Sequence, residues 1–363
     1  MDLAARHLGG AVVAASDESF GPKESLLKPG PVTFVPGTYD HKGEVVDGWE
    51  TRRRRDPGAD WVVVRLGLPG IVRELDVDTT SFRGNAPATC RVEACGVPGY
   101  PTAEELSGWH ELVPETAVRP DAHNVLVVQD DRRWTHLRLW AAPDGGVGRL
   151  RVFGEPVLDP RPLDGLTVDL AAQELGARVI WCSDEFYSPA QALLRPDRPR
   201  SMGEGWEARR RRDPGNDAVV VRLGLAGSPR LVEVDTTCFV HNASAAAAVW
   251  AASCEDDPGP DDARWVPVLP KTRLQPDTCH RFPVSATNAT HVRLDAYPDG
   301  GLARLRLLGA VSSPARAAAI VRWLDALPQP HALAEGLRVN GRPFGTPEAL
   351  RHADPELAVQ LGI

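Results

Sequence analysis

The chain contains no apolar run of about 18 residues, so no membrane-spanning helix is expected. Its first residues lack a basic segment followed by an apolar core, and we therefore expect no signal peptide. Six cysteines are scattered over 363 residues, which excludes a disulfide framework and favours a reduced, cytoplasmic protein. The net charge of -8 argues against a general binder of nucleic acid.

Several motifs that mark well-known chemistries are also missing. There is no HExxH motif, no CxxC pair and no dense histidine cluster, so the sequence gives only a weak signal for a metal. No GxSxG motif, Walker loop or GxGxxG after a strand is present, which leaves a serine hydrolase, an NTPase or a dinucleotide enzyme without support. The cofactor therefore stays unknown, with a divalent cation left open.

A long repeat is the main positive feature of the sequence. Residues 48–68 occur again as residues 205–225, and 18 of these 21 positions are identical; the differences are Thr51/Ala208, Ala59/Asn216 and Trp61/Ala218. The two copies lie 157 residues apart. This spacing is too long for a solenoid and suits a duplicated domain.

Each repeat consists of short apolar stretches between Gly- and Pro-rich turns, with little helical periodicity. This pattern predicts an all-β sandwich. We expect Pro69 and Gly70 to form a turn, and the alternating residues on either side of 143–146 to form a hairpin. The predicted organisation is a first repeat at 1–155, a linker at 156–170, a second repeat at 171–311 and a helical tail at 312–363.

The tail differs in character from the repeats. Ile320, Val321, Leu324 and Leu327 form a helical stripe within 315–327. Residues 346–348 and 354–356 each place a proline after an N-cap residue and before an acid, which is a helix-start signal.

The run of four arginines at 52–55 has two interpretations. If the run is an extended strand, Arg52 and Arg54 point to one side, and all four can pair with Asp56, Asp60 and neighbouring acids. Alternatively, one or two of them bind a substrate carboxylate through a bidentate fork. The sequence alone leaves both interpretations open.

Trp49 and Glu50 precede the arginines. Trp49 packs under the sheet or lines a ligand pocket. The pKa of Glu50 is raised if the tryptophan desolvates it and lowered if the arginines dominate, so Glu50 is either a proton-transfer group or an arginine partner.

Other polar residues have similar alternatives. The pairs Asp17–Glu18 and Asp184–Glu185 end apolar runs, and either bind a structural cation or cap a turn. His136 and His291 start strands, where a lone histidine is more often structural than a ligand.

Taken together, these motifs resemble those of the allantoicase family. The resemblance rests on residues 8–10 and 16–18, 47–55, 77–79 with Phe82, 84–85 and 143–146, and on their copies in the second repeat. It covers about residues 3–310 and implies two galactose-binding-like jelly rolls, hydrolysis of allantoate to ureidoglycolate and urea, and a homo-oligomer.

The resemblance also suggests roles for individual residues. Proton transfer is expected from Glu50, Asp47 and His136. Substrate binding is expected from Arg52, Arg54, Trp49, Asp78, Thr79 and Asn85, and from Glu207, Arg209 and Arg211 in the second repeat. The expected partner is allantoate, with no nucleic acid and no membrane.

The two repeats are not equivalent. Asp47 is replaced by Glu204 and Gly84 by His241, and residues 19–46 have a shorter counterpart at 186–202. We therefore expect the active site in the first repeat or in the cleft between the two. A non-catalytic jelly roll that binds a small polar or anionic ligand is the alternative function.

Overall fold

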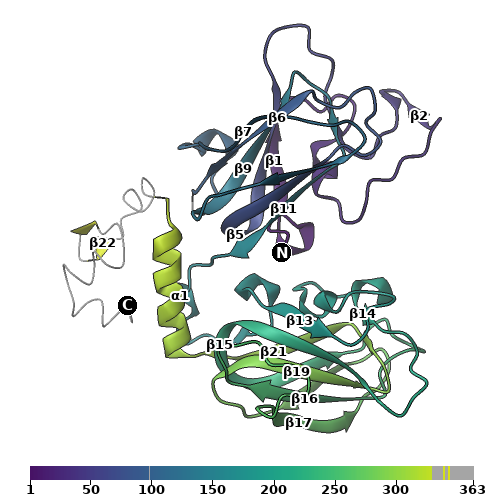
Figure 1. The fold of residues 1–363 in the computed structure, drawn as a ribbon, viewed down its shortest axis with the longest axis vertical. Helices are drawn as coiled ribbons and strands as arrows, with labels where there is room; N and C mark the ends of the chain where they lie inside the picture. The colour runs from purple at the N-terminus through teal and green to yellow at the C-terminus, as the bar shows by residue number, and fades with distance from the viewer. Residues whose placement is uncertain (98, 329–337, 340–341, 344–363) are drawn as a thin grey trace. The chain divides into compact units, whose positions relative to one another are not determined.

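The computed structural model describes residues 1–97, 99–328, 338–339 and 342–343. The chain divides into two compact units, one around residues 1–158 and one around 159–321, and each is a β-sandwich (Figure 1). The all-β class and the two jelly-roll repeats predicted from the sequence are confirmed. Among the described residues, no helix is long and apolar enough to cross a membrane.

The first unit is built around one long strand. The described residues of 1–158 form eleven strands: β1 Ala11–Ala15, β2 Tyr39–Asp40, β3 Gly43–Glu44, β4 Trp49–Glu50, β5 Asp60–Asp78, β6 Thr89–Cys95, β7 His110–Ala117, β8 His123–Val127, β9 Arg133–Ala142, β10 Gly146–Val147 and β11 Arg149–Pro156. Short 3-10 helices lie at η1 Arg6–Leu8, η2 Lys23–Leu27 and η3 Ala103–Glu105.

The long strand β5 belongs to both layers of the sandwich. Its first half pairs with β1 and β9, and its second half pairs with β11 and β8, with β9 reaching as far as Gly70 and Ile71. The register shifts between Arg65 and Gly70, where the strand leaves one layer for the other. The turn predicted at Pro69 and Gly70 is therefore wrong, because the chain continues through them as a strand. There β11 replaces β1 as a partner, while β9 pairs on both sides of Pro69.

The hairpin predicted around residues 143–146 is also wrong. Both flanking strands exist, but β9 pairs with β5 and β6, whereas β11 pairs with the second half of β5. The segment after Ala142 thus carries the chain between layers, and the short β10 pairs with β4 on the way.

The second unit repeats this plan. Its strands are β12 Val168–Asp169, β13 Arg178–Cys182, β14 Trp206–Glu207, β15 Asp217–Asp235, β16 Ala246–Ala252, β17 Val266–Arg273, β18 Cys279–Pro283, β19 Ala289–Tyr297, β20 Gly301–Leu302 and β21 Arg304–Val311. Its 3-10 helices are η4 Arg161–Leu163, η5 Gln173–Leu175, η6 Ala190–Leu194 and η7 Met202–Glu204. The strand β12, which lies within the linker predicted at 156–170, pairs with β21.

The tail begins with the predicted helix, α1 Ser313–Ala326. Ile320 and Leu324 are buried as the stripe predicts, and Trp323 is buried as well. Two short strands, β22 Arg338–Val339 and β23 Arg342–Pro343, pair with each other. The helix starts predicted at 346–348 and 354–356 lie outside the described residues.

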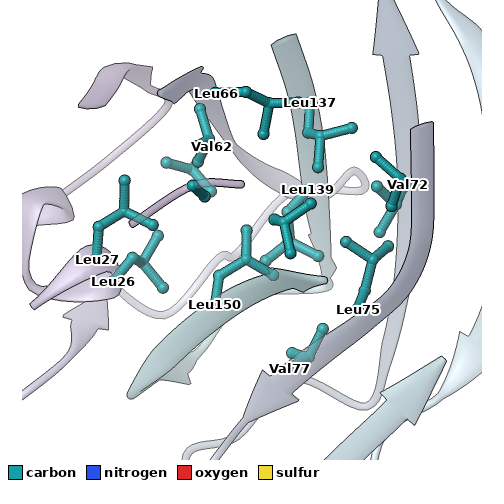
Figure 2. Packing of buried hydrophobic residues seen from close by; sticks show 14 of the residues in the cluster. Leu26, Leu27, Val62, Leu66, Val72, Leu75, Val77, Leu137, Leu139 and Leu150 are labelled. Carbon is teal, nitrogen blue, oxygen red and sulfur yellow. The ribbon is translucent and has the colours of Figure 1, made fainter. Parts of the chain in front are cut away.

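Alternating apolar side chains of β5, β9 and β11 meet between the two layers of the first unit. Figure 2 shows Val62 and Leu75 from β5, Leu139 from β9 and Leu150 from β11 in one cluster, with Leu26 and Leu27 of η2 at its edge. Burial of apolar surface on this scale is the main favourable contribution to the stability of a domain.

We expect Leu137→Ala to lower the free energy of unfolding by about 2–5 kcal/mol, because it removes a fully buried side chain and leaves a cavity. Val125→Ala is the matched control, since Val125 is 55% exposed and should change stability little. Equilibrium unfolding in urea measures both. Equal losses in the two variants would contradict this assignment of the core.

Candidate functional site

Glu50 lies on the two-residue strand β4, at the end of the first sandwich where the chain crosses between layers. It pairs with Gly146 of β10 and forms an isolated bridge with Gly21. Side chains alternate along a strand, so Trp49 points inward and Glu50 outward. Trp49 is fully buried and its indole N–H donates to the carbonyl of Asp17 at 2.7 Å.

The Glu50 carboxylate accepts a hydrogen bond from the side-chain amide of Asn85, with 2.7 Å between Oε1 and Nδ2. Two glycines allow this approach. Gly145 has φ +134°, and a Cβ at Gly146 would lie 2.0 Å from the ring of Phe82. The Gly146 N–H donates to the carbonyl of Asn85 at 2.7 Å, which fixes the Asn85 loop beside β4.

Burial raises the pKa of Glu50 above its ordinary value, and the hydrogen bond from Asn85 opposes this only in part. Among the described residues, Oε1 receives the Asn85 bond and Oε2 has no hydrogen-bond partner. Oε2 is thus the oxygen on which a proton can reside. A partly buried carboxyl group with a raised pKa is suited to proton transfer near neutral pH.

The arginine run that follows is not a strand. Residues 51–59 are irregular, and two acids fix the backbone of the run: the Arg52 N–H donates to Asp17 and the Arg54 N–H to Asp144, both at 2.7 Å. The side chain of Arg54 forms an ion pair with the buried Asp60 at 2.8 Å. The interpretation of the run as acid-paired therefore holds for Arg54.

Arg52 is held more loosely. Its side chain is 76% exposed and its ion-pair partner is Asp17, with 3.7 Å between Nε and Oδ2. Arg53 and Arg55 are also exposed, and neither has an ion-pair partner in the described part of the chain. Within the described residues, Arg53 and Arg55 thus carry positive charge without an acid partner, and Arg52 is only loosely paired.

Asp47 lies three residues before Glu50 and accepts hydrogen bonds from the buried Arg149, from Lys28 and from Thr33. Burial alone would raise its pKa, but the bonds from Arg149 and Lys28 dominate and hold the pKa of Asp47 below its ordinary range. A carboxylate that stays ionised and fully bonded is a poor proton donor, and this environment favours a structural role.

Arg149 itself clamps the loop that leads to Glu50. Its guanidinium donates to the main-chain carbonyls of Ser25, Gly30, Pro31, Asp47 and Gly148. The Arg149 side chain is only 3% exposed. These hydrogen bonds and the ion pair with Asp47 offset the cost of burying its charge.

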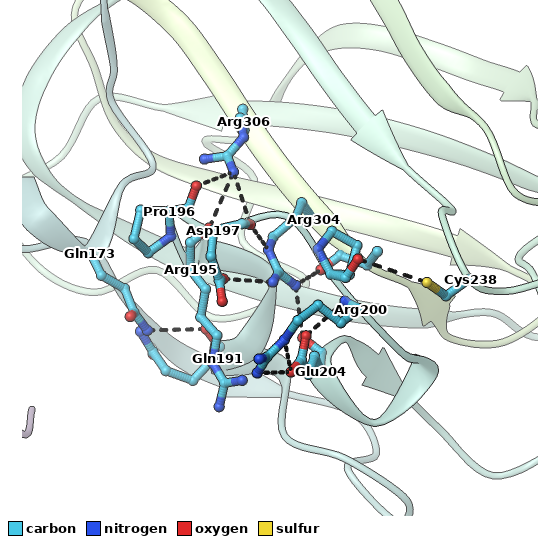
Figure 3. Close-up of polar contacts among 12 residues, drawn as sticks. Gln173, Gln191, Arg195, Pro196, Asp197, Arg200, Glu204, Cys238, Arg304 and Arg306 are labelled. Atoms are coloured by element: carbon cyan, nitrogen blue, oxygen red, sulfur yellow. Dashed lines mark hydrogen bonds and ion pairs between the residues drawn. The ribbon is translucent and has the colours of Figure 1, made fainter. Parts of the chain in front are cut away.

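The second unit contains the same clamp with a different acid. Arg304 donates to the carbonyls of Asp197, Glu204 and Ala303, and its ion-pair partner is the Asp197 carboxylate at 2.7 Å (Figure 3). Glu204, which aligns with Asp47, pairs with Arg200 instead. In the first unit the buried arginine is neutralised by Asp47, at the end of the loop that it binds. In the second unit it is neutralised by Asp197, at the start of the corresponding loop.

The other predicted residues of the second repeat occupy positions like those in the first. Asn242 donates to Glu207 at 2.7 Å, and Arg211 pairs with Asp217 at 2.9 Å. Arg209 is bound more firmly than Arg52: it pairs with Asp184 at 2.8 Å and lies over the ring of Phe186.

Four predicted site residues are not available beside Glu50. Trp49 and Thr79 have no exposed surface, and Asp78 is 3% exposed with Oδ1 accepting the Thr80 N–H. His136 pairs with Arg65 across the strands, whereas Glu50 lies beyond the far end of β9, about 20 Å away at the rise of a strand. Burial lowers the pKa of His136 to about 4, with a further contribution from Arg65. Direct substrate contact by Trp49 and Thr79, and proton transfer by His136 at this site, are therefore not supported.

The roles of two acids in the site were not predicted from the sequence. Asp144 was expected only as a turn residue and Asp17 was expected to cap a turn or bind a cation, yet both accept main-chain N–H groups of the arginine run. Their recurrence in the second repeat, as Asp299 and Asp184, was the available signal. In the described residues, no group of three or more His, Cys, Asp or Glu side chains is arranged to hold a metal ion.

Fold and site together define a protein of two β-sandwich repeats, each with a carboxyl–amide pair beside an arginine run. The family model described as "Allantoicase repeat" matches residues 1–157 and 168–312. A probable allantoicase of Nocardia farcinica is 49% identical over 314 residues, covering 85% of this chain and 93% of the relative. A probable allantoicase of Streptomyces avermitilis is 46% identical over 340 residues and covers 89% of each chain.

A solved structure agrees with these relatives. The crystal structure of allantoicase from Saccharomyces cerevisiae superimposes with a TM-score of 0.73 at 30% identity, covering 85% of this chain and 92% of that one. The chain belongs to the allantoicase family.

We expect Asp47→Asn to destabilise the protein at pH 7 by about 1–3 kcal/mol, because it weakens the compensation of a buried guanidinium. The folded-state pKa of Asp47 is depressed, so its contribution is full above its unfolded pKa and declines as the pH falls through the folded pKa. The difference between variant and parent should therefore be smaller at pH 3 than at pH 7. Urea unfolding at both values measures it.

Asp131→Asn is the control for this experiment, since Asp131 is 87% exposed in its ion pair with Arg73 and should matter little at either pH. A variant at Asp47 with unchanged stability but turnover reduced a hundredfold would instead assign Asp47 to proton transfer.

Proposed function

We propose that this protein hydrolyses allantoate to ureidoglycolate and urea, a step of purine and allantoin degradation, at the Glu50–Asn85 pair of the first unit. Membership of the allantoicase family supports the reaction. The observation that carries the location is the partly buried Glu50, with a raised pKa, followed two residues later by the exposed Arg52, whose ion-pair partner Asp17 is 3.7 Å away.

The reaction needs a proton at nitrogen and a water at carbon. Allantoate carries two ureido groups and one carboxylate on a single carbon. Cleavage breaks the bond from that carbon to one ureido nitrogen, which leaves as urea after gaining a proton. A water oxygen then binds the carbon and loses a proton, so one group that first donates and then accepts a proton serves both steps.

Glu50 fits this double role. Its Oε2 holds a proton in the neutral form and delivers it to the leaving nitrogen. Departure of urea is assisted by the lone pair of the remaining ureido nitrogen, which forms a C=N bond to the carbon. Water adds to that carbon and its proton returns to the Glu50 carboxylate. Asn85 keeps the carboxyl group oriented throughout by its bond to Oε1.

Arg52 is the proposed anchor of the substrate carboxylate. It lies two residues beyond Glu50, is exposed and has only a distant acid, so its fork is open to an anion. Arg54 is unsuited to this role because Asp60 occupies its guanidinium. In the second unit, Asp184 and Phe186 hold Arg209, which supports placing the reaction in the first unit.

The remaining expectations are proposals of the same kind. All six cysteines are free, which supports a reducing compartment such as the cytoplasm. A homo-oligomer is also proposed, and sedimentation of the full chain measures it. A divalent cation is left to the assay below.

We expect the purified protein to release urea from allantoate, before and after chelation and dialysis. Glu50→Gln should lower kcat by about a hundredfold or more, since it removes the proton donor. Glu207→Gln is the matched control and should retain most of the activity.

In the parent, kcat should fall as the pH rises through the raised pKa of Glu50, because the protonated form is the active one.

Three results would change this proposal. Absence of urea from folded protein supplied with divalent ions would favour a non-catalytic module that binds a small anion. Loss of activity on chelation alone would add a metal to the mechanism. Equal effects of the Glu50 and Glu207 variants would remove the preference for the first unit.

We expect Arg52→Ala to raise KM by about tenfold with a smaller change in kcat, because it removes a charged hydrogen bond made in both ground and transition states. Arg209→Ala, its counterpart, should leave KM near the parent value. Steady-state urea release measures both. An unchanged KM in Arg52→Ala would transfer the anchor to Arg53 or Arg55.

A further inference from the structure

In the second unit, away from the Glu207–Asn242 pair, a thiol, an imidazole and a carboxylate form a row in space in which each group contacts the next. Cys254 Sγ is 3.5 Å from His291 Nδ1, and His291 Nε2 is 3.1 Å from Asp257 Oδ1. The same Asp257 oxygen accepts a bond from Arg222 Nη1 at 2.8 Å. This is the order of groups that activates a cysteine: a nucleophile, a base and a carboxylate that orients the base.

The contacts define which ring nitrogen carries the proton. An ionised carboxylate only accepts hydrogen bonds, so His291 Nε2 must be the donor to Asp257. Nδ1 then has the free lone pair and faces the thiol. Thr290 Oγ1 also lies 2.9 Å from Nδ1, but its hydroxyl has two alternative acceptors, the carbonyls of Ala252 and Cys254.

The charged neighbours of His291 come from two segments packed against it. Arg222 lies on β15, and Asp256 and Asp257 lie on the loop after β16. Burial lowers the pKa of His291, while Asp257 opposes this decrease. The imidazole is therefore neutral at physiological pH and able to accept a proton.

The first unit has the histidine but not the rest of the arrangement. Val97 donates its N–H to Thr135 at 2.9 Å, as Cys254 donates to Thr290 at the same distance, so a valine stands where the second unit has the thiol. The arrangement is thus specific to the second repeat.

The other cysteines differ from Cys254 in their surroundings. Burial raises the pKa of Cys90 to about 11 and those of Cys95 and Cys182 to about 12. Cys279 is the most exposed, yet burial of its sulfur and the neighbouring Glu233 raise its pKa to about 11. In the described structure none of them has a hydrogen bond to an imidazole, although Cys95 is the cross-strand neighbour of His136.

We propose that Cys254 is a reactive thiol that exchanges with disulfides of small thiols, with His291 accepting its proton and Asp257 positioning His291. Its residues belong to the second unit, the Glu50–Asn85 pair belongs to the first, and the proposed hydrolysis of a ureido group does not use the thiol.

The exchange needs no reagent other than the disulfide itself. His291 Nδ1 takes the proton of the Cys254 thiol, and the resulting thiolate attacks one sulfur of the disulfide. A new bond forms between Cys254 Sγ and that sulfur, the original sulfur–sulfur bond breaks, and the second sulfur leaves as a thiolate that takes up the proton. A small thiol in excess reverses the reaction.

The full-length protein, treated with substoichiometric 4,4'-dithiodipyridine at pH 7, tests this proposal. Released thiopyridone gives the rate, and peptide mass spectrometry gives the site. Cys254 should be labelled first, about tenfold or more faster than Cys279, although Cys279 is more exposed. Cys254→Ser should abolish the fast phase, and Cys279→Ser should leave it unchanged.

Two variants test the roles of the neighbours. His291→Gln should slow labelling of Cys254 by about tenfold or more, and Asp257→Asn by about threefold or more. His136→Gln, the buried counterpart in the first unit, should leave the rate unchanged. If His291→Gln does not fold, Asp257→Asn decides, because Asp257 lies at the surface. A fast phase that survives Cys254→Ser, or parent rates in the folded neighbour variants, would overturn the proposal.

Discussion

The nineteen residues of β5 hydrogen-bond to four other strands, two in each layer of the sandwich. A strand that is shared between layers makes the layers interdependent, because neither can keep its pairing if β5 is displaced. Because β5 runs the length of both layers, it also determines where the two ends of the sandwich lie. The Glu50 site lies at one of these ends, where β4 and β10 join the crossing segment, so its geometry follows from the position of β5.

The duplication gave the protein two copies of one framework, and the copies have diverged in their side chains. Both keep a glutamate bonded to an asparagine, yet the arginine that follows is loosely held in one and engaged by an acid and an aromatic ring in the other. Beside the equivalent histidines His136 and His291, only the second copy has a thiol and a carboxylate hydrogen-bonded to the ring. The framework tolerates this divergence because each unit has its own core.

The sequence reveals the class of fold because strand periodicity and turn residues are local signals. It does not reveal which strands pair, since Pro69 and Gly70 suit a turn as well as a change of sheet, and alternation on both sides of Asp144 suits a hairpin as well as a crossing. Pairing is decided by contacts between residues distant in the chain.

The same limit applies to the site. Glu50 and Asn85 are both recognisable as candidates, and the structure brings them together. His136 is chemically as suitable as Glu50, but only the register of β9 shows that it lies at the wrong end of the sheet. Nothing in the sequence distinguishes Asp47 and Asp60 from other acids. Their structural roles become visible only when their buried or partly buried arginine partners are known.

The Arg149 clamp has a consequence for how this protein can change. Its guanidinium binds main-chain oxygens of Ser25, Gly30, Pro31 and Asp47, and every residue type supplies such an oxygen. The loop's path is therefore largely independent of the side chains that it carries. Apart from Asp47, whose carboxylate neutralises Arg149, exposed side chains of the loop can be exchanged with little effect on the fold. The loop is therefore a natural place for evolution or a protein engineer to alter what the neighbouring site accepts.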